Sequence, residues 1–405
     1  MTQDVVVGLD LGSGMIRIAV GTIDSSGDLK IIGAVESPSA GISKGVITSI
    51  EDAVSAISTC LERVERIVGV SLERVMVGIS GAHIISQETK GVVAVSRADG
   101  EIGEDDVRRV LEAAQTIATP PNYEIIHVIP RFFTVDNQPS IKDPIGMTGV
   151  RLEVEAQIIL GLSSQIKNLR KCLYRVGLVD EQLIFAPLAC AEAVLNKRQK
   201  ELGVAVINIG NTTTSFAVFE EGDVLTAKVL PVGSRHITAD IAIGLRIPLD
   251  LAEAVKLNYG SSAPQLVKKH EQISLKDLDS KENVVVSKRE VAEIIEARCE
   301  EVFKMIDKEL RAVDRSGKLP AGIVLTGAGA KLPDIVEVAK QVFRLPVSLG
   351  VTNIKTVIDK AADPAFSTAV GLVVWGTLVQ PARKIIVSTK KISNFLKKIF
   401  KGLIP

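Results

Sequence analysis

Aromatic side chains and paired cysteines are scarce in this sequence. Phe, Trp and Tyr make up 3% of the 405 residues, while 46% of the residues are hydrophobic. The core must therefore be built from Val, Ile, Leu and Ala, as in the buried parallel strands of α/β proteins. The four cysteines, Cys60, Cys172, Cys190 and Cys299, have neither a paired spacing nor a histidine at ligand intervals. We expect no disulfide framework and no zinc site, and a reducing cytoplasm fits this pattern.

Signals for secretion or for crossing a membrane are also lacking. The first residues show no basic segment followed by an apolar one. The longest apolar run, "AVGLVVWGTLV" at 369–379, is too short to span a bilayer. We therefore expect this run to be a core helix of a cytoplasmic protein with about two or three domains.

The chain has no net charge, but its charged residues are unevenly distributed along the sequence. The formal net charge is zero, yet residues 383–405 contain seven basic residues and no acidic one. Residues 1–382 therefore carry an excess of negative charge. A negatively charged domain binds nucleic acid poorly. No nucleic-acid partner is expected, and the basic tail needs its own explanation.

One strand–turn–strand motif occurs twice in the chain. The stretch "VGLDLGSGMIRIAV" spans 7–20, and "AVINIGNTTTSFAVF" spans 205–219, so that an offset of 198 aligns Asp10 with Asn208. Turns that contain Gly can direct several backbone N–H groups at one phosphate. Asp10 in the first copy would lie beside those phosphates, where a carboxylate can hold Mg²⁺ through water.

Two further segments have the residue types of a nucleoside site. In "LTGAGAKLP", the loop Gly327–Gly329 can bring bare backbone against an adenine face and a ribose. In "PVGSRHITADIAIGLRIPLDLAEAVK", Gly233 precedes Glu253 and Lys256, which are spaced i, i+3 on one helix face. That pair can grip a ribose and base, or it can be an ordinary exposed ion pair.

The order of these motifs resembles the actin/Hsp70/hexokinase superfamily of ATPases. More narrowly, "HVIPRFFTVDNQPSIKDPIGMTGVRLEVEAQIIL", "LPVGSRHITADIA", "AEAVK" and "STAVGLVVWG" resemble the FtsA family of bacterial actin-like cell-division proteins. The resemblance covers about residues 5–380 and resumes at the C-terminal helix. It implies an α/β, actin-like ATPase fold with two related halves (duplicated ribonuclease H-like cores), an inserted α+β subdomain and a C-terminal amphipathic helix.

The resemblance also implies how the chain is divided. The first half would comprise 1–80, 161–198 and 360–382, and the inserted subdomain 81–160. The second half would comprise 199–230 and 305–359, with a helical subdomain at 231–304, and a linker with the amphipathic helix would occupy 383–405.

ATP and Mg²⁺ are the ligands that the resemblance implies, and each site residue is carried over by its match to the family's motifs. The first phosphate loop would be formed by Asp10, Gly12, Ser13, Gly14 and Arg17, with Asp10 holding Mg²⁺ through water. The second phosphate loop would be formed by Gly210, Asn211, Thr212 and Thr213. The nucleoside would be held by Gly233, Glu253, Lys256, Gly327, Ala328 and Gly329.

The second hairpin departs from the family's usual D-x-G-G-G-T, because Asn208 stands where an aspartate is usual. An amide cannot act as a general base, so we expect ATP binding to survive and hydrolysis to be weakened. Alternatively, Asp10 carries the metal alone and Asn208 changes little. Glu192 in "AEAVL" occupies the position that orients the attacking water in actin-like proteins. It can equally be a glutamate on a helix surface.

The segment "KKISNFLKKIFKGLIP" has the pattern of an amphipathic helix. On a helical wheel, an apolar arc of about 140° is formed by Ile392, Phe395, Leu396, Ile399, Phe400 and Leu403. The opposite side carries Lys390, Lys391, Lys397, Lys398 and Lys401. Interfacial membrane helices that bind anionic lipid have this pattern. Helices that dock in a partner's groove have it too, but the C-terminal position favours the membrane.

These features lead to the hypothesis of an ATP-binding, actin-like protein that polymerises on the cytoplasmic face of the cell membrane at the division septum. It would tether the FtsZ ring there as a peripheral membrane protein and would be a slow ATPase at most, with nucleotide acting mainly as an assembly ligand. By resemblance, the FtsZ C-terminal peptide would bind near Lys288, Arg289 and Arg298, although a solvated charged face is the alternative. Other division proteins would bind the inserted subdomain.

Two other functions fit the same superfamily. A sugar or small-metabolite kinase would need an acceptor pocket with a catalytic Asp between the halves. A pilus-assembly actin-like relative would share the fold more closely. Neither function needs a basic amphipathic tail, so the tail separates them from the membrane tether.

Removal of residues 390–405 should abolish binding to liposomes and leave nucleotide affinity unchanged, because the tail lies outside both halves. Phe395→Glu or Phe400→Glu should weaken binding strongly, since each places a charge in the apolar arc. Changing Lys397 and Lys398 to Gln should weaken it less, and only on anionic lipid at low salt. Cosedimentation with liposomes measures all three effects. Unchanged sedimentation of the truncated chain would refute the membrane role of the tail.

Overall fold

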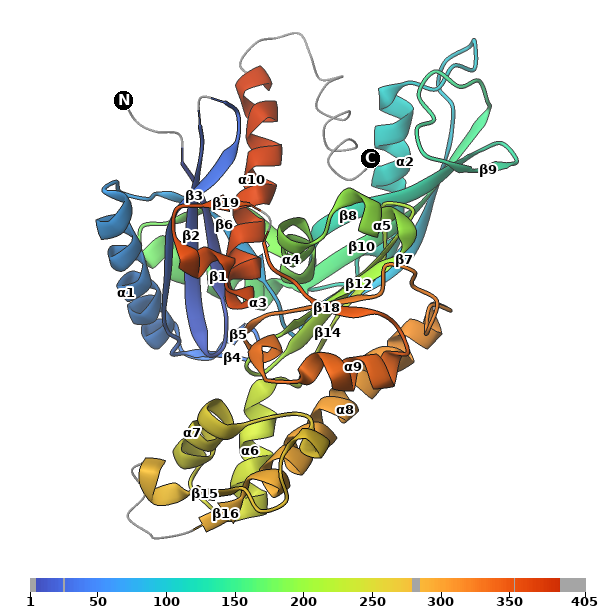
Figure 1. Ribbon diagram of the computed structural model, residues 1–405. Coiled ribbons are helices and arrows are strands. Elements are labelled where there is room, and N and C mark those ends of the chain that lie inside the picture. Colours follow the sequence, from blue (N-terminus) through green and yellow to red (C-terminus); the bar gives the residue numbers. More distant parts are fainter. Residues whose placement is uncertain (1–4, 25, 279–284, 353, 387–405) are drawn as a thin grey trace.

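The computed structural model describes residues 5–24, 26–278, 285–352 and 354–386. Two central β-sheets lie next to each other, with a helical subdomain below them and a smaller sheet with one helix at the upper right (Figure 1). The predicted amphipathic helix, from Ile392 to Leu403, lies outside the described residues.

The first half contains a six-stranded sheet. In spatial order its strands are β11 (Val179–Phe185), β6 (Arg74–Ile79), β1 (Val5–Leu11), β2 (Met15–Ile23), β3 (Leu29–Pro38) and β19 (Lys355–Thr356). Strands β1, β2 and β3 are antiparallel neighbours, while β6 and β11 extend the sheet in parallel beyond β1. Because β19 pairs with β3, the chain has returned to the first half before residue 360, earlier than the sequence suggested.

The second half repeats this arrangement with five strands. In the same spatial order they are β18 (Val347–Leu349), β17 (Ile323–Thr326), β12 (Val204–Ile209), β13 (Thr214–Glu220) and β14 (Asp223–Leu230). Again the first three strands in sequence, β12, β13 and β14, are antiparallel neighbours. The later strands β17 and β18 extend the sheet in parallel beyond β12. The duplication predicted from the two hairpins is confirmed.

Helices cover both sheets. Those of the first half are α1 (Ile50–Val68), α3 (Ser163–Arg175), α4 (Ala186–Val194) and α10 (Ser367–Ile386), and those of the second half are α5 (Lys197–Leu202), α8 (Lys288–Ala312) and α9 (Ile335–Phe343). Helix α4 contacts strands of both sheets and packs against α10, and all its residues but Glu192 are buried. These two helices therefore form the apolar junction between the halves.

Glycine allows α10 to lie unusually close to its neighbours. A Cβ on Gly8 of β1 would lie 2.2 Å from the Ala369 carbonyl oxygen, and one on Gly371 would lie 1.8 Å from the carbonyl oxygen of Ala189. Ala369, Val370, Leu372 and Val373 are fully buried. The expected core helix at 369–379 is thus confirmed, and among the described residues no helix is long and apolar enough to cross a membrane.

The helical subdomain lies below the second sheet (Figure 1). Its elements are α6 (Ser234–Leu245), α7 (Leu249–Tyr259), the paired strands β15 (Gln272–Ser274) and β16 (Val285–Ser287), and the first part of α8. Helix α8 packs against both α6 and α9, so this one helix joins the subdomain to the second half.

The inserted subdomain is an antiparallel sheet covered by one helix. Its strands, in spatial order, are β7 (Ile84–Ala94), β10 (Arg151–Leu162), β8 (Tyr123–Val135) and β9 (Gln138–Ile141), and the helix is α2 (Glu104–Ala118). Helix α2 packs on β7 at Gly91, where a Cβ would lie 2.1 Å from the Val110 carbonyl oxygen. The predicted α+β insertion is confirmed.

The insertion contacts both halves. It is joined to the first half by its two chain crossings, and Lys142 forms an ion pair with Asp223 at the start of β14 in the second half. The Asp223 side chain is 14% exposed, and burial raises the pKa of its carboxyl group although Lys142 opposes the shift.

A buried histidine joins the insertion to the first half. His127 of β8 is 7% exposed, and its Nε2 accepts a hydrogen bond of 3.0 Å from the backbone N–H of Phe185. Its ring lies 5.5 Å from that of Trp375 on α10, the one tryptophan of the chain. Burial lowers the pKa of His127 to about 4, so the imidazole is neutral at neutral pH.

Because unfolded histidine titrates near pH 6.5, the free energy of unfolding should fall as the pH drops from 6.5 towards 4. The full difference would be on the order of 3 kcal/mol. Denaturant unfolding followed by Trp375 fluorescence measures it. Asp10, with its pKa raised to about 6, changes the free energy of unfolding in the same pH range but in the opposite direction. The test is therefore the difference in free energy of unfolding between wild type and His127→Gln at each pH. Parallel pH dependences of the two proteins would contradict this role of His127.

Candidate functional site

A cavity of about 720 Å³ lies between the two halves, within the size range of small-molecule sites. Both hairpin turns line it, as do the Gly-rich loop after β17 and parts of α6 and α7. The predicted residues that line it are Asp10, Gly12, Ser13, Gly14, Arg17, Gly210, Asn211, Thr212, Thr213, Glu253, Lys256, Gly327, Ala328 and Gly329. The structure therefore brings together residues from four distant parts of the sequence.

The two turns touch each other because Gly14 has no side chain. A Cβ at Gly14 would lie 2.9 Å from Nδ2 of Asn211, so the amide of the second turn packs directly on the first turn. Gly12 is equally restricted, since a Cβ there would lie 2.6 Å from the carbonyl oxygen of Met15. An anion in the cavity would thus meet backbone from both halves.

Gly233 does not line the cavity but supports the second turn from behind. A Cβ at Gly233 would lie 2.7 Å from the carbonyl oxygens of Gly210 and Asn211. The N–H groups of Ser234 and Arg235 donate to those same two carbonyls, at 2.9 and 2.8 Å. The start of α6 is therefore fixed against the second turn, which the sequence did not reveal.

A small hairpin of the first half holds one hydroxyl of each turn. It consists of β4 (Ile42–Ser43) and β5 (Val46–Ile47), and its tip is left-handed, with φ of 49° at Lys44 and 74° at Gly45. The N–H of Gly45 donates to Oγ of Ser13 at 3.2 Å, and the N–H of Lys44 donates to Oγ1 of Thr212 at 3.1 Å. Both hydroxyls thus accept from backbone and keep their own hydrogens for a ligand.

Asp10 at the end of β1 is one of the residues that line the cavity. Burial raises the pKa of this carboxyl group to about 6, while the positive charge of Arg17 opposes the shift. Such a carboxylate lacks solvation and would be stabilised by a cation. The residue therefore fits the predicted role of holding Mg²⁺ through water.

Asn208 connects three elements at the junction of the halves. Its Nδ2 donates to Oγ1 of Thr368 on α10 at 3.2 Å and to Sγ of Cys190 on α4 at 3.3 Å. Those two acceptors are themselves 3.0 Å apart. The amide at position 208 donates to both partners, whereas a carboxylate there could only accept, so the Thr368 hydroxyl and the Cys190 thiol would have to become the donors. The burial that raises the pKa of the Cys190 thiol to about 12 keeps that group neutral.

The Gly-rich loop Gly327–Gly329 packs on β12, the strand that leads into the second turn. Gly327 has φ of 87°, and a Cβ there would lie 2.2 Å from Oδ1 of Asn208. Its N–H donates to the Pro364 carbonyl oxygen at 3.1 Å, which ties the loop to the segment before α10. The loop and that segment together form one wall of the cavity.

The predicted pair Glu253–Lys256 is a cluster rather than an exposed ion pair. Nζ of Lys256, a residue 7% exposed, donates to the Glu253 carboxylate at 2.7 Å and to Oγ1 of Thr238 at 2.8 Å. The Thr238 hydroxyl also donates to Glu253. The half-exposed carboxylate of Glu253 therefore has a fixed position at the cavity wall.

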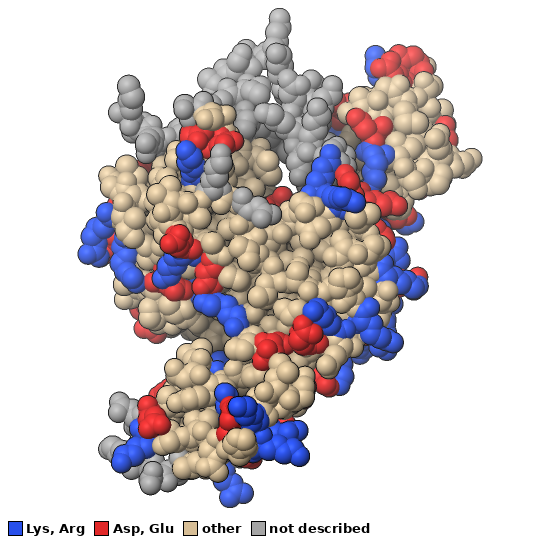
Figure 2. Space-filling view, viewed as in Figure 1, with Lys and Arg blue, Asp and Glu red and all other residues tan. Residues whose placement is uncertain are grey.

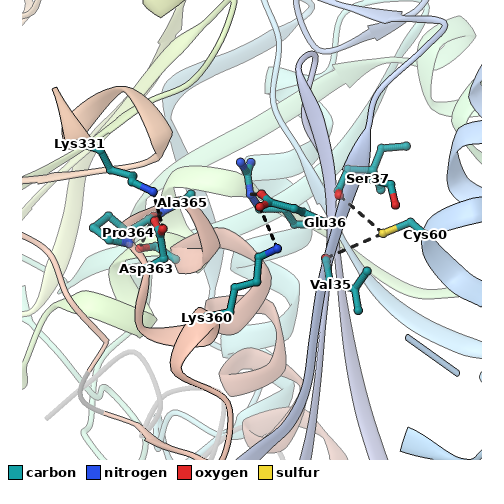
Figure 3. Close-up of polar contacts among 12 residues, drawn as sticks. Val35, Glu36, Ser37, Cys60, Lys331, Lys360, Asp363, Pro364 and Ala365 are labelled. Atoms are coloured by element: carbon teal, nitrogen blue, oxygen red, sulfur yellow. Dashed lines mark hydrogen bonds and ion pairs between the residues drawn. The ribbon is translucent and has the colours of Figure 1, made fainter. Parts of the chain in front are cut away.

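Two further ion pairs lie at the edge of the cavity. Glu36 accepts from Nε of Arg17 at 3.1 Å and pairs with Nζ of Lys360 at 2.9 Å, while Lys331 pairs with Asp363 at 2.5 Å. Figure 3 shows the Glu36–Lys360 and Lys331–Asp363 contacts side by side. These partners hold the pKa values of Glu36 and Asp363 below their usual range despite burial. Arg17, predicted to bind phosphate, is thus already paired.

The structure does not bring Glu192 to the cavity. Its carboxylate pairs with Nζ of Lys200 at 2.7 Å, and it is not among the lining residues. The predicted role of orienting a water molecule has no geometric support here, because the side chain of α4 that faces the junction near Asn208 is Cys190.

The predicted partner-binding residues lie on α8, away from the cavity, and each is paired. Lys288 pairs with Glu271 at 2.9 Å and Arg289 with Glu293 at 3.2 Å. Arg298 forms a two-pronged contact with Asp240, at 2.6 and 2.9 Å. Figure 2 shows basic and acidic side chains interleaved on the lower subdomain. The membrane residues from Ile392 to Leu403 lie outside the described residues.

Comparison with known proteins identifies the family. The family model described as "Cell division protein FtsA" matches residues 205–371, and the model of the "SHS2 domain inserted in FTSA" matches 81–160. The curated cell division protein FtsA of Pseudomonas aeruginosa is 36% identical over 372 residues, 92% of this chain and 89% of that protein. The chain belongs to the FtsA family of cell-division proteins.

Solved structures agree with the actin-like fold of the FtsA family. A structure of a PilM–PilN type IV pilus biogenesis complex has a TM-score of 0.67 at 15% identity and covers 92% of this chain and 98% of that one. MreB5 of Spiroplasma citri bound to ADP has a TM-score of 0.53 at 15% identity, covering 96% and 99% of the two chains. At these identities the likeness concerns the fold alone.

Asn208→Asp should destabilise this FtsA-family chain by about 1–3 kcal/mol at pH 8, because the hydrogen bonds to Thr368 and Cys190 must reverse their direction and a second carboxylate is confined at the junction. The loss should shrink at pH 5, where Asp10, with its pKa of about 6, is protonated. Denaturant unfolding without nucleotide measures this. Asn258→Asp, an exposed position on α7, is the matched control. Equal stability of wild type and Asn208→Asp at pH 8 would show that the amide is not required.

Proposed function

We propose that this chain binds ATP with Mg²⁺ in the cavity between the halves and uses the nucleotide mainly as a conformational and assembly ligand. The observation that carries the proposal is the pair of matching turns that meet across one cavity. Two backbone-lined turns with free hydroxyl hydrogens fit a polyphosphate better than a neutral metabolite. The bound ADP in the MreB5 structure supports nucleotide as the ligand class for this fold.

Each part of the cavity fits one part of such a ligand. The turns at Ser13–Gly14 and Gly210–Thr213 would hold the phosphates through backbone N–H groups and hydroxyls. The nucleoside would lie between the Gly327–Gly329 loop and the Glu253–Lys256 cluster. Mg²⁺, when bound, would neutralise phosphate charge, and Asp10 would hold it through water.

Hydrolysis should be slow because the residues near the phosphates lack a general base. Asn208 has no proton-accepting carboxylate, and Glu192 is paired with Lys200 outside the cavity. Asp10 is the lining carboxylate without an ion pair among the described residues, and it is reserved for the cation. Binding and closure of the halves would then be the main effect of ATP.

The wider role follows from the family and from the tail. The chain would polymerise on the cytoplasmic face of the membrane, tether the FtsZ ring through the lower subdomain near Arg298, and present the insertion to other division proteins. One interfacial helix is a modest anchor, so a polymer that presents many tails would gain avidity.

Both alternative functions are less well supported. A kinase would need a catalytic aspartate in addition to the metal-holding one, yet Asp363, the other aspartate that lines the cavity, is paired with Lys331. The pilus-complex structure shares 15% identity, whereas the curated FtsA relative shares 36%. The membrane tether therefore remains the proposal.

Wild-type protein should bind Mg²⁺–ATP saturably and turn it over far more slowly than about 10 per second. Its affinity for Mg²⁺–ATP should fall as the pH drops through about 6, because protonated Asp10 cannot hold the cation. Asp10→Asn should remove both the Mg²⁺ dependence and this pH dependence, while Asp250→Asn on α7 should not. Calorimetry and phosphate release provide the two measurements. No saturable ATP binding, or turnover at an ordinary enzymatic rate, would disprove the proposed function.

A further inference from the structure

The charges that line the cavity are almost fully paired with one another. Four acidic and four basic side chains line it. Among them, Arg17 is paired with Glu36, Lys256 with Glu253, and Lys331 with Asp363. Within the described residues, Arg235 is the lining cation that has no ion pair and no side-chain hydrogen bond.

Arg235 is an exposed residue in the first turn of α6. Its backbone N–H donates to the Asn211 carbonyl oxygen at 2.8 Å, so its Cα has a fixed position beside the second turn. Asn211 in turn packs on Gly14 of the first turn. Arg235 therefore lies beside the place where the two turns meet, and it is one of the residues that line the cavity.

The other cations are less available to a phosphate. Arg17 is 9% exposed, is held by Glu36, and has its guanidinium 5.7 Å from the centre of the Phe366 ring. Lys256 makes three hydrogen bonds, to Glu253, Thr238 and the Ser234 carbonyl. Either residue would have to break existing contacts to bind an anion, whereas Arg235 has no ion pair or side-chain hydrogen bond to break in the part of the chain that the structure describes.

We propose that Arg235 binds the terminal phosphate of a nucleoside triphosphate and gives the cavity its preference for the triphosphate over the diphosphate. This inference rests on the proposed nucleotide function. The terminal phosphate is the group that both turns would share, and it would lie where they meet. A planar guanidinium suits phosphate because it can donate two parallel hydrogen bonds. The diphosphate lacks that group and would not reach Arg235.

The test compares Mg²⁺–ATP and Mg²⁺–ADP on the full-length chain at constant ionic strength, by calorimetry. Arg235→Ala should lower ATP affinity about 10- to 100-fold, as for a lost charge-assisted hydrogen bond. ADP affinity should change less than about 3-fold. Arg235→Lys should give an intermediate loss for ATP, since it keeps the charge without the fork.

Two controls separate this effect from general damage. Arg198→Ala removes an exposed arginine of α5 that does not line the cavity, and it should bind both nucleotides like wild type. Thermal unfolding without nucleotide should be the same for wild type and Arg235→Ala, because the Arg235 side chain has no ion pair or hydrogen bond with the described residues to lose.

Equal losses for ATP and ADP, or no loss for either, would overturn the assignment of Arg235 while leaving the proposed function intact. Absence of ATP binding by wild type would instead refute the proposed function and the assignment together. A loss confined to ATP in Arg235→Ala supports the assignment.

Discussion

The close approach of two β-turns, one from each half, is the constraint on which the rest of this structure depends. Gly14 must lack a side chain because the amide of Asn211 occupies the space that a Cβ would need. Gly233 must lack one because the second turn lies against it. The duplicated sheets place the turns opposite each other, but these glycines determine that the turns touch. Without that contact, the cavity would have two separate walls.

Balance of charge is a second constraint on the same region. A cavity that binds a polyanion needs positive charge, yet unpaired positive charges repel one another and destabilise the ligand-free protein. Here each of three lining cations has an acid beside it, namely Glu36, Glu253 or Asp363. In the proposed nucleotide complex, backbone dipoles, which need no counter-charge, would therefore supply most of the attraction for the phosphates.

Much of this architecture could be predicted from local sequence patterns, and the exceptions have a common cause. The repeated hairpin, the Gly327–Gly329 loop and the α+β insertion all have short-range signals in turn residues and apolar periodicity. The apolar run at 369–379, predicted to be a core helix, lies within α10. By contrast, the sequence assigns Arg17 to the phosphate and Glu192 to the attacking water or to a helix surface, while the structure pairs them with Glu36 and Lys200. Such partners are set by the tertiary fold, and nothing in the spacing of the chain reveals them. Arg235 was missed for the same reason, since its distinguishing property is the lack of a partner.

The contact between the insertion and the second half has a mechanical consequence. The insertion leaves and rejoins the chain at the first half, yet Lys142 fixes it to Asp223 of the second half. A rotation that widened the cavity would either separate this pair, leaving a carboxylate in a poorly solvated place, or turn the whole four-stranded sheet with the second half. The insertion thus links the two halves through the Lys142–Asp223 ion pair. Its orientation relative to the first sheet would therefore change with the width of the cavity.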